Sequence, residues 1–237
     1  MKTATLKSLR ATLHNQANKS DAEILQRFFK TGPGEYAEGD IFIGVRVPTI
    51  RRIAREYQTV PLRDAATLLQ STIHEERMLA LVILMLQYKR GTPGQQAKIY
   101  DRYMANTANI NNWDLIDVTA PHIVGAFLQN LPRTPLYVFA RSNSLWERRI
   151  AIISTFHFIK HNDFEDTLAI AAILLHDAHD LIHKAVGWML REVGNRDLQA
   201  EEAFLKKHYR TMPRTMLRYA IEKFPEPKRQ RYRKGTA

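Results

Sequence analysis

ERMLALVILML, residues 76 to 86, decides the fold, because similar stretches recur along the chain. They are NWDLIDVTAPHI (112–123), ERRIAIISTFHF (147–158), HKAVGWMLREV (183–193) and LRYAIEKF (217–224). Aligned on Arg77, Trp113, Arg149, Lys184 and Arg218, they are 36, 36, 35 and 34 residues apart. Such a period is typical of stacked two-helix repeats, because one helix pair cannot bury its apolar face alone. The sequence therefore predicts an α-solenoid.

Helical periodicity extends over the rest of the chain, and no stretch alternates as a strand. Helices are predicted near 3–17, 22–30, 47–57, 61–71, 75–89, 94–105, 112–130, 134–142, 145–159, 163–175, 179–193, 197–208, 213–223 and 225–233. Pro121 lies inside one of these helices and is expected to kink or split it. We expect an all-α fold, with one repeat domain over residues 1–224 and a basic tail over 225–237.

Composition narrows the possible partners. The formal net charge of +11 favours a polyanionic partner such as nucleic acid. The chain has no cysteine, which excludes disulfides, thiolate catalysis and cysteine-ligated metals. Its longest apolar run, residues 78–86, is about half of the roughly 18 residues needed to cross a bilayer. We expect a protein of the bacterial cytoplasm, without a membrane partner and monomeric.

The repeat register predicts a functional surface. Equivalent positions of stacked repeats form a row, so the aligned residues Arg77, Trp113, Arg149, Lys184 and Arg218 would share one wall. One helical turn later the register adds Asp117 and Trp188 to the same wall. A basic trough of this kind suits the regularly spaced phosphates of DNA.

The two tryptophans and the carboxylate predict a site for a cation inside this trough. Aromatic faces and carboxylates both attract positive charge. DNA alkylated at N3 or N7 of a purine is a polyanion that carries a local cation, and its weakened glycosidic bond breaks through an oxocarbenium-like sugar. Asp117 could stabilise that charge and position the attacking water. Asp114, three residues earlier, is the alternative that spacing alone leaves open, although a capping role is natural for it.

The chain resembles the AlkD-like family of bacterial alkylpurine DNA glycosylases. The resemblance is carried by IFIGVRVPTIRRIAREY (41–57), NNWDLIDVTAPHIVG (111–125), LWERRIAI (145–152) and HKAVGWMLRE (183–192). It implies a right-handed solenoid of about six HEAT-like two-helix repeats with a concave basic groove.

The resemblance also implies a monofunctional glycosylase that excises N3- and N7-alkylated purines from duplex DNA without flipping the base. Asp117 is then the catalytic carboxylate, and Trp113 and Trp188 pack against the lesion sugar. Arg149 is the groove arginine, and no metal or cofactor is implied. Arg46 stands where some members have a polar amide, and we expect it to contact DNA together with Lys184, Arg77 and Arg218. The preferred lesion stays open.

Three other functions compete with this interpretation. The main alternative is a non-catalytic HEAT-like module that binds distorted or branched DNA. A protein–protein scaffold would lack affinity for duplex DNA, and an RNA-binding solenoid would present stacking aromatics in every repeat. His176, His179 and His183 have the spacing of one helix face, but we expect them to be solvated or capping residues and not metal ligands. The basic residues of the tail could add phosphate contacts.

Overall fold

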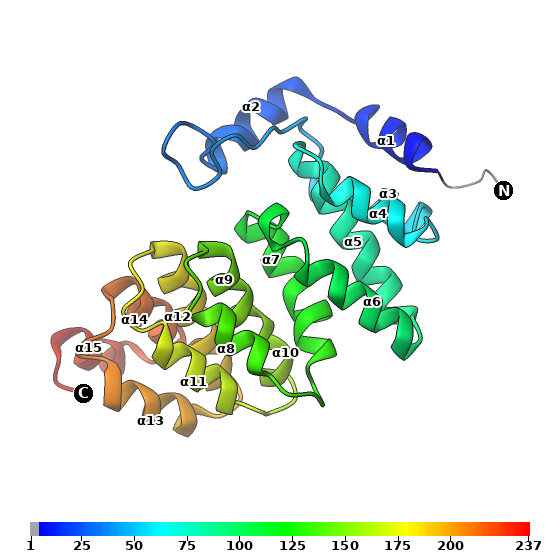
Figure 1. Cartoon of the computed structure of the whole chain (residues 1–237). Coiled ribbons are helices and arrows are strands. Elements are labelled where there is room, and N and C mark those ends of the chain that lie inside the picture. The colour runs from blue at the N-terminus through cyan, green and yellow to red at the C-terminus, as the bar shows by residue number, and fades with distance from the viewer. Residues whose placement is uncertain (1–4) are drawn as a thin grey trace. The chain divides into compact units, whose positions relative to one another are not determined.

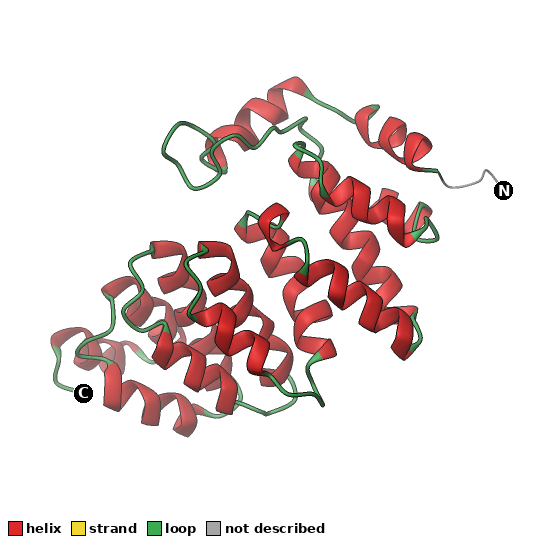
Figure 2. Ribbon diagram, in the orientation of Figure 1, coloured by secondary structure: helices red, strands yellow, loops and turns green. Residues whose placement is uncertain are grey.

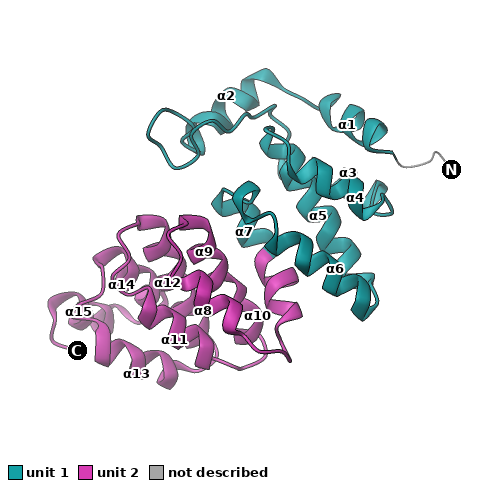
Figure 3. Ribbon diagram, in the orientation of Figure 1, with its two compact units in different colours: residues 1–119 teal, residues 120–237 magenta. Residues whose placement is uncertain are grey.

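The computed structural model describes residues 5–237, which form helices joined by loops (Figure 1). Within that range no strand is present, and the only β-type pairing is an isolated bridge between Ile41 and Ile73 (Figure 2). The all-α prediction is therefore confirmed. The chain divides into two compact units, residues 1–119 and 120–237 (Figure 3). Over residues 5–237 we find no helix that is both long and apolar enough to cross a membrane.

Unit 1 is built around one long helix, α5. Its helices are α1 (Leu6–His14), α2 (Lys19–Phe28), α3 (Val47–Glu56), α4 (Leu62–Leu69), α5 (His74–Arg90), α6 (Pro93–Met104) and α7, which begins at Trp113 and ends at Ala120. Helix α5 packs against α3, α4 and α6. Residues 78–84 of α5 are all buried and all apolar, as expected for a helix enclosed on every side.

The first turn of α5 carries four consecutive charged or titratable residues that are all buried: His74, Glu75, Glu76 and Arg77. Each has its own partners, as buried charges require. Glu76 binds Arg10 at 3.1 Å and His14 at 2.8 Å, both on α1. This turn therefore ties α1 to α5 through side chains alone.

Glu75 holds the loop that precedes α3. Its Oε1 accepts hydrogen bonds from the backbone N–H groups of Ile43, Gly44 and Val45, at 3.1, 2.8 and 3.2 Å. Gly44 has φ +84°, and a Cβ atom there would lie 2.0 Å from the carbonyl oxygen of Asn18. Only glycine permits this backbone shape and this close approach. The loop is thereby fixed against the start of α2.

Unit 2 consists of helix pairs. Its elements are the π-helix η2 (Pro121–Gly125), α8 (Thr134–Ala140), α9 (Leu145–Ser154), α10 (Phe156–Ile159), α11 (Glu165–Ile173), α12 (Asp180–Gly194), α13 (Leu198–His208), α14 (Arg214–Ala220), the 3-10 helix η3 (Ile221–Lys223) and α15 (Glu226–Lys234). Helix α8 packs on α9, and both α11 and α13 pack on α12. Helices α9, α12 and α14 are successive neighbours. These three carry the repeat positions of Arg149, Lys184 and Arg218.

The approach of α12 to α14 depends on Gly187. A Cβ atom at this position would lie 2.4 Å from the carbonyl oxygen of Met216 and 2.6 Å from Cβ of Tyr219. Distances this short exclude any larger residue without a shift of the helices. Gly187 therefore sets how closely α12 and α14 pack.

Two details of the predicted helices agree with the structure. The helix predicted over 112–130 is interrupted at Pro121 by the π-helix, as the proline led us to expect. The helix predicted over 225–233 is present as α15, whose Tyr232 is buried against Tyr209 and Phe224 with ring centres 5.3 and 5.7 Å away. The Tyr209 hydroxyl also lies within hydrogen-bond distance of the Gly235 and Ala237 carbonyls. This segment is packed onto unit 2.

Candidate active site

Trp113 and Asp117 lie one turn apart on α7, within unit 1. The indole ring of Trp113 stacks on Phe29, with ring centres 5.1 Å apart, and meets the edge of Phe28 at 5.9 Å. Its Nε1 donates a hydrogen bond to the Tyr36 hydroxyl at 3.2 Å. The ring is half-buried, with its polar atom satisfied. Trp113 is therefore held in one orientation before any ligand binds.

Asp117 is half-buried, neither enclosed in the core nor fully exposed. Its charge acts on unit 1, since burial and the nearby Asp117 carboxylate together raise the pKa of Tyr103. Asp117 and Trp113 share one face of α7 by their spacing, so a site for a cation between them stays a prediction.

Asp114 binds the side chain of His74. Its Oδ2 lies 2.9 Å from Nε2 of His74, and the other ring nitrogen of His74 lies 3.2 Å from Oδ2 of Asp40. His74 is thus clamped between two carboxylates. The imidazole also stacks on Phe42, with ring centres 4.3 Å apart. Asp114 thus has a structural role at the start of α7, and Asp117 stays the predicted catalytic acid.

The clamp determines the charge of His74. Burial alone would lower the pKa of His74, but the Coulombic attraction of Asp114 and the hydrogen bonds to Asp114 and Asp40 outweigh it and raise that pKa to about 9. Burial likewise opposes ionisation of Asp40, yet His74 and Arg77 hold the pKa of its carboxyl below the usual range. At neutral pH His74 is therefore protonated and Asp40 is ionised, and the Asp40–His74–Asp114 chain links the start of α5 to the start of α7.

Arg77 belongs to this cluster and not to an open groove. Its Nη2 donates to Oδ1 of Asp40 at 2.7 Å, its Nη1 donates to the Ser71 carbonyl at 2.9 Å, and 3% of the residue is exposed. These contacts do not support the predicted DNA contact of Arg77. A carboxylate from the loop before α3 binds its guanidinium within unit 1, so we expect a structural role for Arg77.

Arg46 is exposed but paired. Its Nη2 donates to Oδ1 of Asp21 at 2.6 Å, and this hydrogen bond lowers the pKa of Asp21. Solvent screens an exposed ion pair and leaves it weak, so a phosphate can compete for such an arginine. Arg46 therefore remains a candidate DNA contact.

Trp188 is the corresponding aromatic residue of unit 2, on α12. Its Nε1 donates to Oε1 of Glu192 at 3.1 Å, and its ring lies 5.8 Å from that of Phe156. The residue is half-buried and directly follows Gly187. Close packing of α12 on α14 therefore fixes the backbone that carries the ring.

Three basic residues of unit 2 that were predicted to contact DNA lie on neighbouring helices but have different partners. Arg149 is 5% exposed and donates to the Leu181 carbonyl at 2.5 Å. Lys184 binds Asp180 at 2.7 Å. Burial disfavours the charged form of Asp180, but Lys184 and Thr215 more than compensate and lower its pKa. Arg218 is exposed, and its guanidinium lies 5.9 Å from the ring centre of Tyr219.

Sequence reasoning missed Phe28, Phe29 and Tyr36, which contact Trp113, and it missed His74 and Asp40, which hold Asp114. The signal was present in part, since the Phe28–Phe29 pair and the Gly-rich loop that carries Tyr36 are conspicuous. Two of the three histidines considered as metal ligands have other contacts: Nδ1 of His179 caps the N–H of Leu181, and Nε2 of His183 lies 2.5 Å from the Asp177 carbonyl. Within residues 5–237 no group of three or more potential metal ligands occurs.

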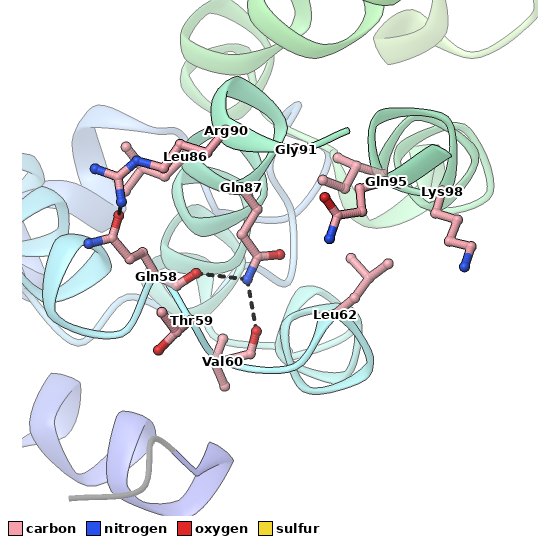
Figure 4. Close-up of a pocket in the computed structure, with 11 residues that line it drawn as sticks. Gln58, Thr59, Val60, Leu62, Leu86, Gln87, Arg90, Gly91, Gln95 and Lys98 are labelled. Atoms are coloured by element: carbon pink, nitrogen blue, oxygen red, sulfur yellow. Dashed lines mark hydrogen bonds between the residues drawn. The ribbon is translucent and has the colours of Figure 1, made fainter. Parts of the chain in front are cut away.

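Two cavities of unit 1 contain neither Trp113 nor Asp117 in their lining. One, of about 390 Å³, lies beside the C-terminal end of α5, where Nε2 of Gln87 donates to the carbonyls of Gln58 and Val60 (Figure 4). The other, of about 370 Å³, is mostly apolar. It shares Phe28 and Phe29 with the cluster around Trp113.

The sequence of the chain matches a known protein family. A family model described as DNA alkylation repair enzyme matches residues 9–224. The chain belongs to the DNA alkylation repair enzyme family. This match covers Trp113, Asp117, Arg149 and Trp188, and the resemblance inferred from the sequence motifs is confirmed at the level of the family.

Solved structures agree on the fold of this DNA alkylation repair enzyme family member. A predicted DNA alkylation repair enzyme from Enterococcus faecalis is similar with a TM-score of 0.70 and 17% identity, over 89% of this chain and 98% of that one. AlkD2 from Streptococcus mutans is similar with a TM-score of 0.53 and 17% identity, over 94% of this chain and 100% of that one. At such identity the likeness concerns the fold. No curated protein sequence matches the chain.

Proposed function

We propose that the protein is a monofunctional DNA glycosylase that hydrolyses the N-glycosidic bond of cationic N3- or N7-alkylated purines in duplex DNA, without base flipping. The observation that carries the proposal is that Trp113 and Asp117 are half-buried residues one turn apart on α7, within a chain of the DNA alkylation repair enzyme family. Membership of the DNA alkylation repair enzyme family supports the choice of substrate.

In the proposed mechanism Asp117 acts on the sugar. A base alkylated at N3 or N7 leaves as a neutral molecule and needs no general acid. As the glycosidic bond lengthens, positive charge moves onto the deoxyribose, and the fixed carboxylate stabilises that charge more than the ground state. The same carboxylate accepts a hydrogen bond from the water that attacks C1′ and takes up its proton.

The indole faces would stabilise the same positive charge on the deoxyribose. Trp113, held by Phe29 and Tyr36, offers a π-face to the electron-poor sugar from unit 1. Trp188 would do so from unit 2, with Arg149, Lys184 and Arg218 on the DNA backbone. The proposal requires both units to present these residues to one duplex, as a right-handed solenoid of HEAT-like repeats with a concave basic groove would. We propose that it acts as a monomer in the bacterial cytoplasm, without metal or cofactor.

Release of free bases tests the activity. The protein is incubated with methylated duplex DNA, and the liberated purines are separated by chromatography. Asp117→Asn should slow release by about 10²–10³-fold, the usual cost of losing one transition-state electrostatic contact. Asp114→Asn is the matched control on the same helix, and at a temperature where both variants are folded it should retain most activity. Undiminished release by Asp117→Asn would remove that residue from the mechanism.

A binding experiment tests the charge that Asp117 is proposed to stabilise. Two duplexes are compared, one with a cationic pyrrolidine in place of the lesion sugar and one with a neutral tetrahydrofuran. The wild type should prefer the cationic duplex, and Asp117→Asn should lose that preference while binding the neutral duplex as before. Tight duplex binding without preference and without base release would instead support a non-catalytic module for distorted or branched DNA.

A further inference from the structure

The C-terminal segment forms a cavity with α14 that is dominated by arginine. The cavity has a volume of about 240 Å³ and lies entirely within unit 2. Its lining residues are Arg214, Thr215, Leu217, Arg218 and Arg233. Three guanidinium groups therefore surround one space, and none of the lining residues is acidic.

Carboxylates compensate these arginines weakly. Among the described residues 5–237, neither Arg214 nor Arg218 has a carboxylate within ion-pair distance. Arg233 has one distant partner, Oε1 of Glu226 at 3.8 Å, but the other oxygen of Glu226 binds Arg229 at 2.9 Å. Like charges gathered without counter-charges repel one another, and a bound anion removes that repulsion.

The cavity is held in shape by packing and backbone contacts. Nη2 of Arg214 donates to the Arg233 carbonyl at 3.0 Å, which joins α14 to α15. Buried Tyr232, the residue before Arg233, fixes α15 against Tyr209 and Phe224. The C-terminal segment is therefore a wall of the cavity.

Lys184, the other predicted phosphate ligand in this part of unit 2, has a carboxylate partner of its own. Its ammonium group is neutralised by Asp180, to which Thr215 is also hydrogen-bonded. The arginine cavity has no such internal anion. Guanidinium groups bind phosphate oxygens through paired N–H donors, so three of them around one space match a phosphate better than a carboxylate.

We propose that Arg214, Arg218 and Arg233 form a phosphate site that holds one backbone phosphate of duplex DNA, with Arg233 contributed by the C-terminal helix. The inference rests on the proposed DNA-binding function and extends the DNA contacts beyond the repeat row to α15. It gives the segment 225–237 a defined contact in place of diffuse attraction.

The test has two arms. In the first, inorganic phosphate is titrated into the protein while the arginine side-chain N–H signals are followed by NMR. The signals of Arg214, Arg218 and Arg233 should shift together, and Arg233→Gln should abolish the shift. In the second, the salt dependence of binding to undamaged duplex DNA is measured. Arg214→Gln and Arg218→Gln should each lower the slope of log K against log salt by about 1.

Arg141→Gln is the matched control. Arg141 is an exposed arginine of unit 2 that donates one hydrogen bond to a backbone carbonyl, that of Tyr137 at 3.0 Å, as Arg214 does to Arg233. Its loss should leave both readouts unchanged. Arg218→Gln keeps the α14–α15 hydrogen bond, so a folding defect of Arg214→Gln would not remove the test.

Three results would overturn the inference: no phosphate-induced shift at the three arginines, an unchanged salt slope in Arg218→Gln, or an equal loss of slope in Arg141→Gln. Phosphate binding with an unchanged slope would mean that DNA does not use the site. Base release from methylated DNA is measured separately, so its failure would reject the glycosylase proposal while the salt slopes still judge this site.

Discussion

Oδ2 of Asp114 lies 2.9 Å from Nε2 of His74, across 40 residues of sequence. This contact distinguishes two acids that share one helix: Asp114 holds α7 to α5, and Asp117, one turn later, is half-buried. Trp113, on the same helix, is held separately by Phe28, Phe29 and Tyr36.

Asp114→Asn should destabilise the protein without removing its chemistry. The substitution takes a charged partner from buried His74, and such hydrogen bonds contribute about 1.5–3 kcal/mol. The free energy of unfolding, measured with urea, should fall by that amount, while Asp117→Asn should change it by less than about 1 kcal/mol. If Asp117→Asn is the more destabilising of the two, then Asp117 carries the structural role and the assignment must be reversed.

The charge on His74 predicts a pH-dependent stability. The pKa of His74 is about 9 in the folded protein and near its ordinary value of 6.5 when unfolded. A raised folded-state pKa means that the stabilisation is complete below pH 6.5 and is lost as pH rises to 9. The free energy of unfolding should therefore decline between pH 6.5 and 9.

His74→Gln is the control for that decline. Burial raises the pKa of Glu201 in unit 2 to about 8 in the folded protein, whereas the unfolded chain has the ordinary value of 4.5. The free energy of unfolding therefore also falls through Glu201 as pH rises from 4.5 to 8. The contribution of Glu201 persists in His74→Gln, and the difference between the two proteins isolates His74. Identical pH profiles for the wild type and His74→Gln would rule out a protonated His74 in the folded state.

Arg77→Ala should act on stability and not on DNA binding. Arg77 and Asp40 form a buried ion pair, and removal of one member of such a pair costs about 3–5 kcal/mol. The melting temperature should drop strongly, whereas the salt slope for duplex DNA should stay at the wild-type value below the melting temperature. A lower slope would return Arg77 to the DNA-binding surface.

Gly187→Ala tests whether α12 and α14 are packed to their limit. The added methyl group would overlap the Met216 carbonyl, and overpacking of this kind costs about 1–3 kcal/mol. Base release should fall as well, because Trp188 follows directly. Gly94→Ala, in α6 with open space around its Cβ position, is the control and should raise stability by about 0.5–1 kcal/mol. Equal stabilities for the two variants would contradict the close packing at Gly187.

The sequence predicted the helices well because their signals are local. Apolar spacing and prolines lie within each segment, so the interruption at Pro121 could be anticipated. The burial of Arg77 could not be, since its partner Asp40 is 37 residues away in a loop without helical period. The Asp114–His74 contact could not be predicted either, because the two residues are 40 positions apart in the sequence. Local period predicts which residues share a helix face, but a single long-range pair decides whether a charge turns outward or inward.

The carboxylate of Glu75 has a consequence for selectivity among anions. The amide groups of residues 43–45, grouped as in many sites that capture free phosphate, are already saturated by an anion that the chain itself supplies. Phosphate or nucleotides dissolved in the cell have nothing to gain at this loop. The backbone of residues 43–45 therefore keeps its conformation whatever the concentration of free phosphate around it.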